Sequence, residues 1–145
     1  MILYFKEENA FLSNFYESSI TLEGINYPTV EHAFQAAKSL GADVRHKIAS
    51  ATTPGGAKSL GRQVCLRPDW EQIKDSVMLE CVREKFKNPE LRAKLLSTED
   101  EELVEGNWWH DNYWGSCHCP KCLHIEGKNK LGKILMQVRE EIKNS

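Results

Sequence analysis

The sequence predicts an α+β fold that is predominantly helical, with a small β-sheet, in a single domain over residues 1–145. The length is typical of one domain, and 41% hydrophobic with 28% charged residues is ordinary for a globular protein. Apolar residues recur at helical intervals through the middle of the chain, whereas short alternating segments lie on either side of it. No repeat, low-complexity tract or linker marks an internal boundary.

Short strands are predicted at three places. Residues 2–5 form an apolar segment at the N-terminus, and residues 103–104 form another late in the chain. Residues 20–27 alternate around Glu23-Gly24, which predicts a hairpin because glycine accepts the positive φ of a tight turn. The sheet is therefore expected to be small.

Helices are predicted from apolar positions with a period near 3.6 and from the capping residues that precede them. Thr29 is suited to cap the first helix, and Thr53, followed by Pro54, is suited to cap the third. The predicted helices cover residues 30–40, 43–50, 54–60, 70–87, 89–96 and 131–142, the last with Asn129 as a candidate cap. The long irregular stretch 106–127 is expected to be functional.

Charge and cysteine content narrow the classes of function. Nineteen basic against 21 acidic residues give a net charge of -2, which disfavours tight nonspecific binding of nucleic acid. No basic leader precedes the apolar N-terminus, and no apolar stretch approaches the roughly 20 residues of a membrane span. Five cysteines, three of them within six residues, indicate reduced or metal-binding thiols rather than disulfides. We therefore expect a cytoplasmic protein with no membrane contact.

Glu31, Gln35 and Lys38 are spaced by four and three residues, so on a helix they share one stripe. A solvated helix face is one interpretation. The other is a catalytic lysine, because a partly desolvated amine can lose its proton and attack a carbonyl to form a Schiff base. An opened ribose offers such a carbonyl at its anomeric carbon.

The segment 105–115, EGNWWHDNYWG, combines three tryptophans, a tyrosine and two carboxylates. Aromatic walls suit a flat base, and a carboxylate such as Asp111 can act as a general base or stabilise positive charge. An aromatic mini-core, with Asp111 satisfying a turn, is the alternative. Lys58 and Arg62 flank Gly61 and could hold a phosphate, although two solvated basic side chains would give the same pattern.

Cys117, Cys119 and Cys122 form a Cys-x-Cys-x-x-Cys run. Zinc takes four tetrahedral ligands, and thiolates a few residues apart commonly supply them. The fourth ligand would come from His110, His118, His124 or Cys81. The alternatives are reduced loop thiols without a metal and, as a different class of function, a zinc-dependent adaptor.

Several ordered motifs resemble those of the NADAR, or YbiA-like, family. They are FLSNF at 11–15, YPTVEHAFQAAK at 27–38, Gly61-Arg62, DNYWG at 111–115 and GKNKLGKILM at 127–136. The resemblance implies a YbiA-like fold and an N-glycosidase activity, which hydrolyses the bond between a ribose carbon and a base nitrogen. One branch of the family cleaves ribosylamino-pyrimidine phosphates of riboflavin synthesis, and another removes ADP-ribose from guanine in nucleic acid.

The resemblance also implies roles for single residues. The positions that would be catalytic are Lys38, Asp111, Glu31 and Glu105. The positions that would bind substrate are Asn14, Phe15, Gln35, Arg62, Trp114, Gly115 and Asn129. In our working hypothesis a base stacks near Trp114, Arg62 holds phosphate and Lys38 captures the opened ribose, and direct attack by an activated water is the alternative route.

Residues 116–126, which carry the cysteines, depart from the family pattern and leave the substrate open. It is either a small nucleotide intermediate or an ADP-ribosylated base, free or in DNA or RNA. No cofactor is expected for catalysis. A non-catalytic module that binds ADP-ribose or NAD is the rival, and the presence of both Lys38 and Asp111 favours an enzyme.

Overall fold

A computed structural model describes residues 1–145, and six α-helices make up most of its regular structure. The chain divides into two compact units: Asn14–Lys87, the helical unit, and Met1–Ser13 with Asn88–Ser145, the loop unit. The single domain expected over the whole chain stays a prediction. None of the helices combines the length and the apolar composition that crossing a membrane requires.

The helical unit begins with a small hairpin. Strands β1 (Ile20–Leu22) and β2 (Ile25–Tyr27) are antiparallel. Glu23 and Gly24 at the turn have positive φ angles of 49° and 83°, the conformation of a type I′ turn. The predicted hairpin is therefore confirmed.

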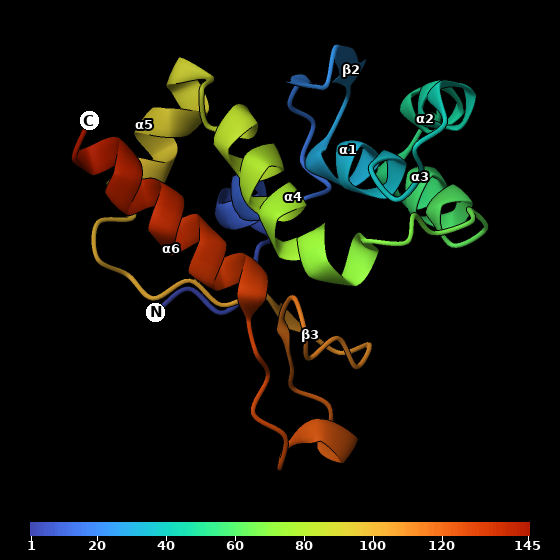
Figure 1. The fold of residues 1–145 in the computed structure, drawn as a ribbon. Coiled ribbons are helices and arrows are strands. Elements are labelled where there is room, and N and C mark those ends of the chain that lie inside the picture. Colours follow the sequence, from blue (N-terminus) through green and yellow to red (C-terminus); the bar gives the residue numbers. More distant parts are fainter. The chain divides into compact units, whose positions relative to one another are not determined.

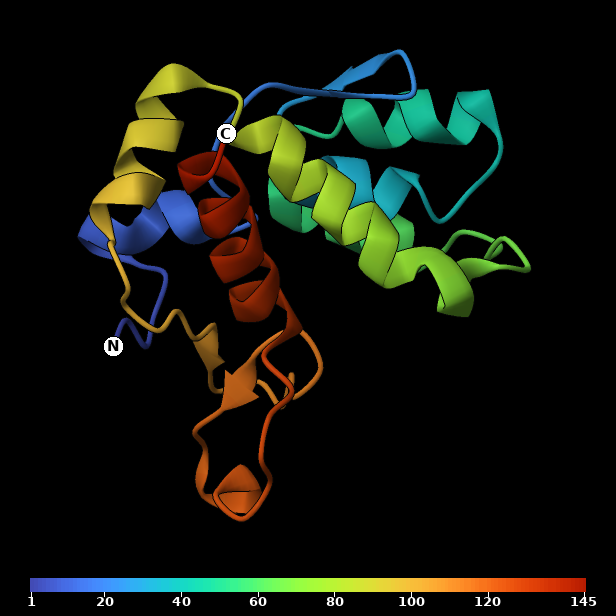
Figure 2. The ribbon, with the colours of Figure 1, turned by 60° about the vertical axis from the view of Figure 1, so that its left-hand side comes forward.

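Four helices complete the helical unit: α1 (Val30–Ala36), α2 (Ala42–Ala49), α3 (Pro54–Gly61) and α4 (Trp70–Lys85). The predicted caps are confirmed, since the hydroxyl of Thr29 accepts a hydrogen bond from the His32 amide and that of Thr53 accepts one from Gly56. All seven residues of α1 are buried, and α1 contacts α2, α3 and α4 (Figure 2). The first helix thus forms the core of this unit.

Helix α1 ends four residues earlier than predicted. The amides of Lys38 and Ser39 donate to carbonyls three residues back, at 3.2 and 3.1 Å, which tightens the last turn. Leu40, which extends the apolar period in the sequence, is 67% exposed. Lys38 therefore lies in the turn after the helix rather than on it.

The loop unit contains α5 (Pro89–Ser97), α6 (Lys130–Lys143) and a 3₁₀-helix, η1 (Glu7–Leu12). Helix α5 contacts both α6 and η1 (Figure 1). The two α-helices are confirmed, whereas η1 is not among the predicted elements. The side chain of Asn88 caps α5 by accepting hydrogen bonds from two backbone amides.

Between α5 and α6 the chain forms two short parallel strands, β3 (Gly106–Asn107) and β4 (Ser116–Cys117), and a 3₁₀-helix, η2 (Pro120–Cys122). Figures 1 and 2 show this stretch, in orange, extending from the N-terminal end of α6. Apart from these short elements it is irregular, as predicted.

The continuous strands predicted at the N-terminus and at residues 103–104 are wrong. Ile2 and Leu103 form only an isolated parallel bridge. The amide of Gly106 donates both to the Leu3 carbonyl and to the Val104 carbonyl. The hydrogen-bond pattern of a parallel ladder therefore does not continue beyond the bridge.

Candidate functional site

The helical unit places Glu31 and Gln35 on α1 and Lys38 in the turn that follows. Glu31 and Gln35 are 7% and 4% exposed, and Lys38 is half-buried. The solvated helix face, which the spacing also allowed, is therefore wrong. The carboxylate and the amide are instead buried, and the amine is half-buried.

Gly61, the last residue of α3, lies against Gln35. A Cβ at position 61 would collide with Gln35 Oε1 and would lie 2.9 Å from the Gln35 Cβ, so a side chain here would displace the amide. Gln35 Oε1 is buried and accepts no hydrogen bond. An unsatisfied buried acceptor costs about 1–3 kcal/mol, which makes this oxygen a ready acceptor for a ligand N–H or O–H.

Burial lowers the pKa of Lys38 below its usual value. The carboxylate of Glu31 opposes this shift by favouring the charged amine, whereas the positive charges of Arg62 and Lys58 add to it. The net shift of the pKa is downward. At a given pH, a larger fraction of Lys38 is therefore the neutral, nucleophilic amine than for a lysine in water.

The other predicted residues of the helical unit are less buried. The carbonyl of Asn14 accepts a hydrogen bond from the Glu31 amide at 3.1 Å, and its side-chain amide donates to the Met78 sulfur at 3.6 Å. Phe15 is 46% exposed, and Arg62, at the C-cap of α3, is also exposed. The guanidinium of Arg62 can therefore meet an anion from solution.

Asp111 holds a tight turn in the loop unit. Its Oδ1 accepts hydrogen bonds from the amides of Tyr113 at 3.0 Å and Trp114 at 2.9 Å. The rings of Tyr113 and Trp114 meet edge to face, with centroids 4.9 Å apart. Trp108 and Trp109 are more than half exposed, so the aromatic mini-core is wrong for these two residues. Asp111 does satisfy the turn.

Asn129 joins the two ends of the loop. Its Oδ1 accepts a hydrogen bond from the Glu105 amide, and its Nδ2 donates to the Leu103 carbonyl, both at 2.9 Å. Asn129 is the N-cap residue of α6, as predicted, but its backbone is left-handed, with φ 49°, and its side chain makes no capping hydrogen bond. The backbone of Gly115 lies against the Glu105 carbonyl with no space for a Cβ. Glu105, Gly115 and Asn129 are thus neighbours.

Asn107 is a structural centre of the loop that the sequence did not reveal. It is 1% exposed. Its Oδ1 accepts hydrogen bonds from the amides of Trp109 at 3.2 Å and Asp111 at 3.1 Å, and its Nδ2 donates to the Asp111 carbonyl at 2.8 Å. One side chain therefore fixes both backbone groups of Asp111, and no spacing rule marks an asparagine for that role.

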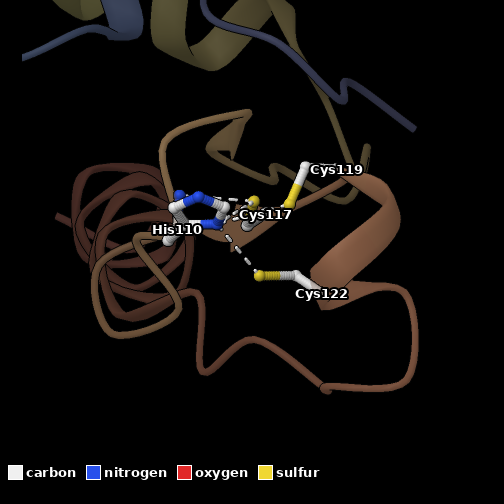
Figure 3. A group of neighbouring side chains, drawn as sticks. All are labelled: His110, Cys117, Cys119 and Cys122. Atoms are coloured by element: carbon white, nitrogen blue, oxygen red, sulfur yellow. Dashed lines mark hydrogen bonds between the residues drawn. The ribbon is translucent and has the colours of Figure 1, made fainter.

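Four potential metal ligands converge in the loop unit (Figure 3): His110, Cys117, Cys119 and Cys122. Their ligand atoms all lie within 4.8 Å of one another. The His110 Nδ1 is 3.8, 3.3 and 3.4 Å from the three sulfurs in chain order. A tetrahedral ion with bonds of about 2.3 Å to sulfur and 2.0 Å to nitrogen separates those atoms by about 3.5 Å. The cluster could therefore hold a metal ion.

The geometry selects His110 from the four candidates for the fourth ligand. His118, His124 and Cys81 are not part of the cluster, and Cys81 lies on α4 in the helical unit. The three loop cysteines are free thiols in this structure, so an arrangement of reduced thiols without a metal stays an alternative.

Lys85, the last residue of α4, is a buried residue that the sequence pattern also did not identify. It is 2% exposed, and burial lowers its pKa to about 7. Its ammonium lies 5.7 Å from the ring centroid of Tyr16 and 5.3 Å from that of Phe86. An apolar period cannot mark a lysine as buried, because lysine counts as polar in the pattern.

Residues 3–143 match the model of the NADAR domain. The chain is 41% identical over 133 residues to the N-glycosidase YbiA of Escherichia coli (strain K12), which covers 90% of this chain and 79% of that protein. It is 43% identical over 138 residues to the N-glycosidase Npun_R5314 of Nostoc punctiforme, with 91% and 85% covered.

The NMR structure of the E. coli protein YbiA matches this fold with a TM-score of 0.84 at 37% sequence identity, covering 99% of this chain and 86% of that one. The predicted YbiA-like α+β fold is therefore confirmed. A riboflavin biosynthesis protein of Vibrio vulnificus is 40% identical over 139 residues, which is 94% of this chain and 36% of that longer protein.

Proposed function

The chain belongs to the NADAR family, as its motifs predicted, and on that premise we propose that it is an N-glycosidase. The bond cleaved joins the anomeric carbon of a ribose to a nitrogen. The observation that carries the proposal is the similarity, over nine tenths of the chain, to relatives that are named N-glycosidases. The half-buried amine of Lys38 is chemically suited to this reaction, because a neutral amine attacks an anomeric carbon.

The favoured substrate is a small nucleotide, a ribosylamino-pyrimidine phosphate of riboflavin synthesis. One support is that relatives in Vibrio vulnificus and Zea mays are named riboflavin biosynthesis proteins. The other is the net charge of -2, which does not favour binding of nucleic acid. An ADP-ribosylated guanine, free or in DNA or RNA, is the second candidate. The two candidate substrates are distinguished by which base the protein releases from its ribose, the pyrimidine or the guanine.

In the proposed reaction the ribose ring opens: the bond between the anomeric carbon and the ring oxygen breaks, the ring oxygen takes a proton from Asp111 or Glu31, and an imine forms between the anomeric carbon and the base nitrogen. The Lys38 amine then adds to that carbon, a proton passes from Lys38 Nζ to the base nitrogen through the carboxylate, and the base leaves, so that the imine now joins the sugar to Lys38. Water then hydrolyses the imine, which returns the free amine and releases the sugar phosphate. In the alternative, a carboxylate takes a proton from water, and the resulting hydroxide attacks an oxocarbenium-like ribose directly. Only the first route forms a covalent bond to the protein.

The remaining roles follow from the resemblance and the chemistry of each group. Arg62 binds a substrate phosphate, because an exposed guanidinium suits bidentate contact with one. Gln35 accepts a hydrogen bond from the substrate through its unsatisfied oxygen. Trp114 offers a ring for the base. The other residues proposed to take part are Glu105, Asn14, Phe15, Gly115 and Asn129.

The test incubates the full chain separately with a ribosylamino-pyrimidine phosphate and with an ADP-ribosylated guanine oligonucleotide, and follows loss of ribose by mass spectrometry. Sodium borohydride added during turnover reduces an imine, so the lysine route predicts a stable adduct on Lys38. Lys38→Ala should lose the adduct and activity by about 1,000-fold or more. Lys47→Ala, which removes an exposed lysine of α2, is the matched control.

Full activity of Lys38→Ala would exclude the Schiff-base route. The direct route predicts that Asp111→Ala loses activity and that borohydride traps nothing. Binding of ADP-ribose without cleavage of either substrate would support the rival, non-catalytic module.

We further propose that the ion held by the His110 and cysteine cluster is zinc, since three thiolates and one imidazole in a tetrahedral arrangement form a common structural zinc site. Three protein thiols of this kind stay reduced in the cytoplasm, which is the proposed location. Elemental analysis should find one zinc per chain in the wild type and in Cys65→Ser, an exposed cysteine outside the cluster. Cys119→Ser should lose most of it.

A further inference from the structure

We propose that the metal ion of the cluster positions the Asp111 turn, so that a structural metal site controls the order of a carboxylate assigned to catalysis. The inference rests on the proposed N-glycosidase function only for its activity readout. Metal content and the order of the turn can be measured without any substrate.

The ligand His110 is the residue directly before Asp111. Its backbone has a positive φ of 70°, a conformation that is uncommon for a residue other than glycine and needs support from its surroundings. Its amide donates to the Cys117 sulfur at 3.3 Å, and its ring faces the sulfurs of all three cysteines (Figure 3). A metal bond to the ring would therefore hold the residue that starts the turn.

The turn is also tied to the strand that carries the first cysteine. The Oδ1 of Asn112 accepts a hydrogen bond from the Cys117 amide at 2.9 Å. The carbonyl of Asn107 accepts one from the His118 amide at 2.8 Å, while its side chain holds both backbone groups of Asp111. Movement of β4 would thus be transmitted to both ends of the turn.

Apart from the hydrogen bonds at its two ends, the cysteine loop has little support from packed apolar side chains. Within residues 116–128 the buried residues are the three cysteines themselves, which form a cluster of their own. The large apolar side chains Leu123 and Ile125 are 73% and 44% exposed. Three sulfurs brought together without a metal make only weak hydrogen bonds, whereas a structural zinc contributes folding free energy directly. The ion is therefore the expected source of order in this loop.

A pair of variants at one position tests the coupling. His110→Cys offers a fourth thiolate and should keep zinc, whereas His110→Ala removes a ligand and should weaken zinc binding. The readouts are zinc per chain, the absorption spectrum of the Co²⁺-loaded protein, and hydrogen–deuterium exchange of the Tyr113 and Trp114 amides, which bond to Asp111 Oδ1. Cys65→Ser is the matched control.

His110→Ala should exchange these two amides about tenfold faster or more, while amides in α1 to α4 keep their wild-type rates. Its kcat should fall by about 10- to 100-fold with a smaller change in KM, and His110→Cys should restore most of both losses. Slow exchange and normal kcat in a His110→Ala protein shown to lack zinc would overturn the inference, as would wild-type protein that binds neither Zn²⁺ nor Co²⁺.

Failure of the proposed function would look different. If the wild type cleaves neither substrate, the N-glycosidase proposal fails, whereas the zinc and exchange measurements still decide whether the metal orders the turn.

Discussion

The surroundings of Lys38 and those of Asp111 are built by different means. In the helical unit, polar side chains are positioned by helix packing: α1 is buried along its whole length, and Gly61 lets Gln35 lie directly against α3. In the loop unit, the Asp111 turn is held by hydrogen bonds between side chains and the backbone, and the cluster of His110 with three cysteines, which could hold a metal ion, lies beside it.

The two regions should therefore be sensitive to different kinds of substitution. A packed helix interface is sensitive to added volume, because its atoms have nowhere to move. A loop held by polar groups is sensitive to the loss or reversal of a single donor or acceptor, because a buried group left unsatisfied is costly. Substitutions of each kind should therefore have unequal effects in the two units.

The largest effect is expected from Asn107→Asp. The change keeps the acceptor for the Asp111 amide but replaces the donor with a second oxygen that faces the Asp111 carbonyl, at a site that is 1% exposed. A buried charge without a suitable partner should lower the free energy of unfolding by about 3 kcal/mol or more, measured by urea denaturation with zinc present.

The matched control is Asn26→Asp, at the exposed position of strand β2, which should change the free energy of unfolding by less than about 0.5 kcal/mol. Equal effects at the two positions would mean that the bonds of Asn107 do not support the turn.

The sequence predicted the helical unit well because its signals are local. Thr29 and Thr53 act as caps within four residues of themselves, and the period of 3.6 marks a helix whatever surrounds it. The end of α1 was misplaced because exposed Leu40 continued the period after the hydrogen bonds had changed. Periodicity reports polarity and not the hydrogen-bond pattern.

The loop unit was predicted only in outline. The cysteine spacing indicated a metal site, but the fourth ligand was open among four residues, because the choice depends on how residues 107–117 fold back on themselves. The motif drew attention to Asp111 and not to Asn107, whose function consists of bonds to backbone groups two and four residues away. Such bonds leave no periodic pattern in a sequence.

A smaller effect is expected from Gly61→Ala, which adds volume to the helical unit. The new methyl group would collide with Gln35 and should lower the free energy of unfolding by about 1–3 kcal/mol. Gly55→Ala in the same helix has open space around it, with the Thr53 hydroxyl 4.0 Å away, and should raise stability by up to about 1 kcal/mol.

Both alanine variants should keep one zinc per chain and slow exchange of the Trp114 amide. Loss of zinc from Gly61→Ala would contradict the separate support of the two regions.

The smallest effect is expected on the pKa of Lys38 when the charges around it change, because Lys38 is only half-buried and solvent screens its interactions with other charges. The Glu31 carboxylate raises the pKa of Lys38 and the Lys58 charge lowers it, both against a larger lowering by burial. Glu31→Gln should therefore lower the pKa of Lys38 and shift the rising limb of kcat/KM against pH to lower pH, since the neutral amine forms at lower pH; loss of a proton donor would reduce the height of the profile but would not move the limb. Lys58→Gln should raise that pKa and shift the limb to higher pH. Shifts in the same direction, or a limb that neither change moves, would show that the limb does not report deprotonation of Lys38, and the amine would lose its proposed role.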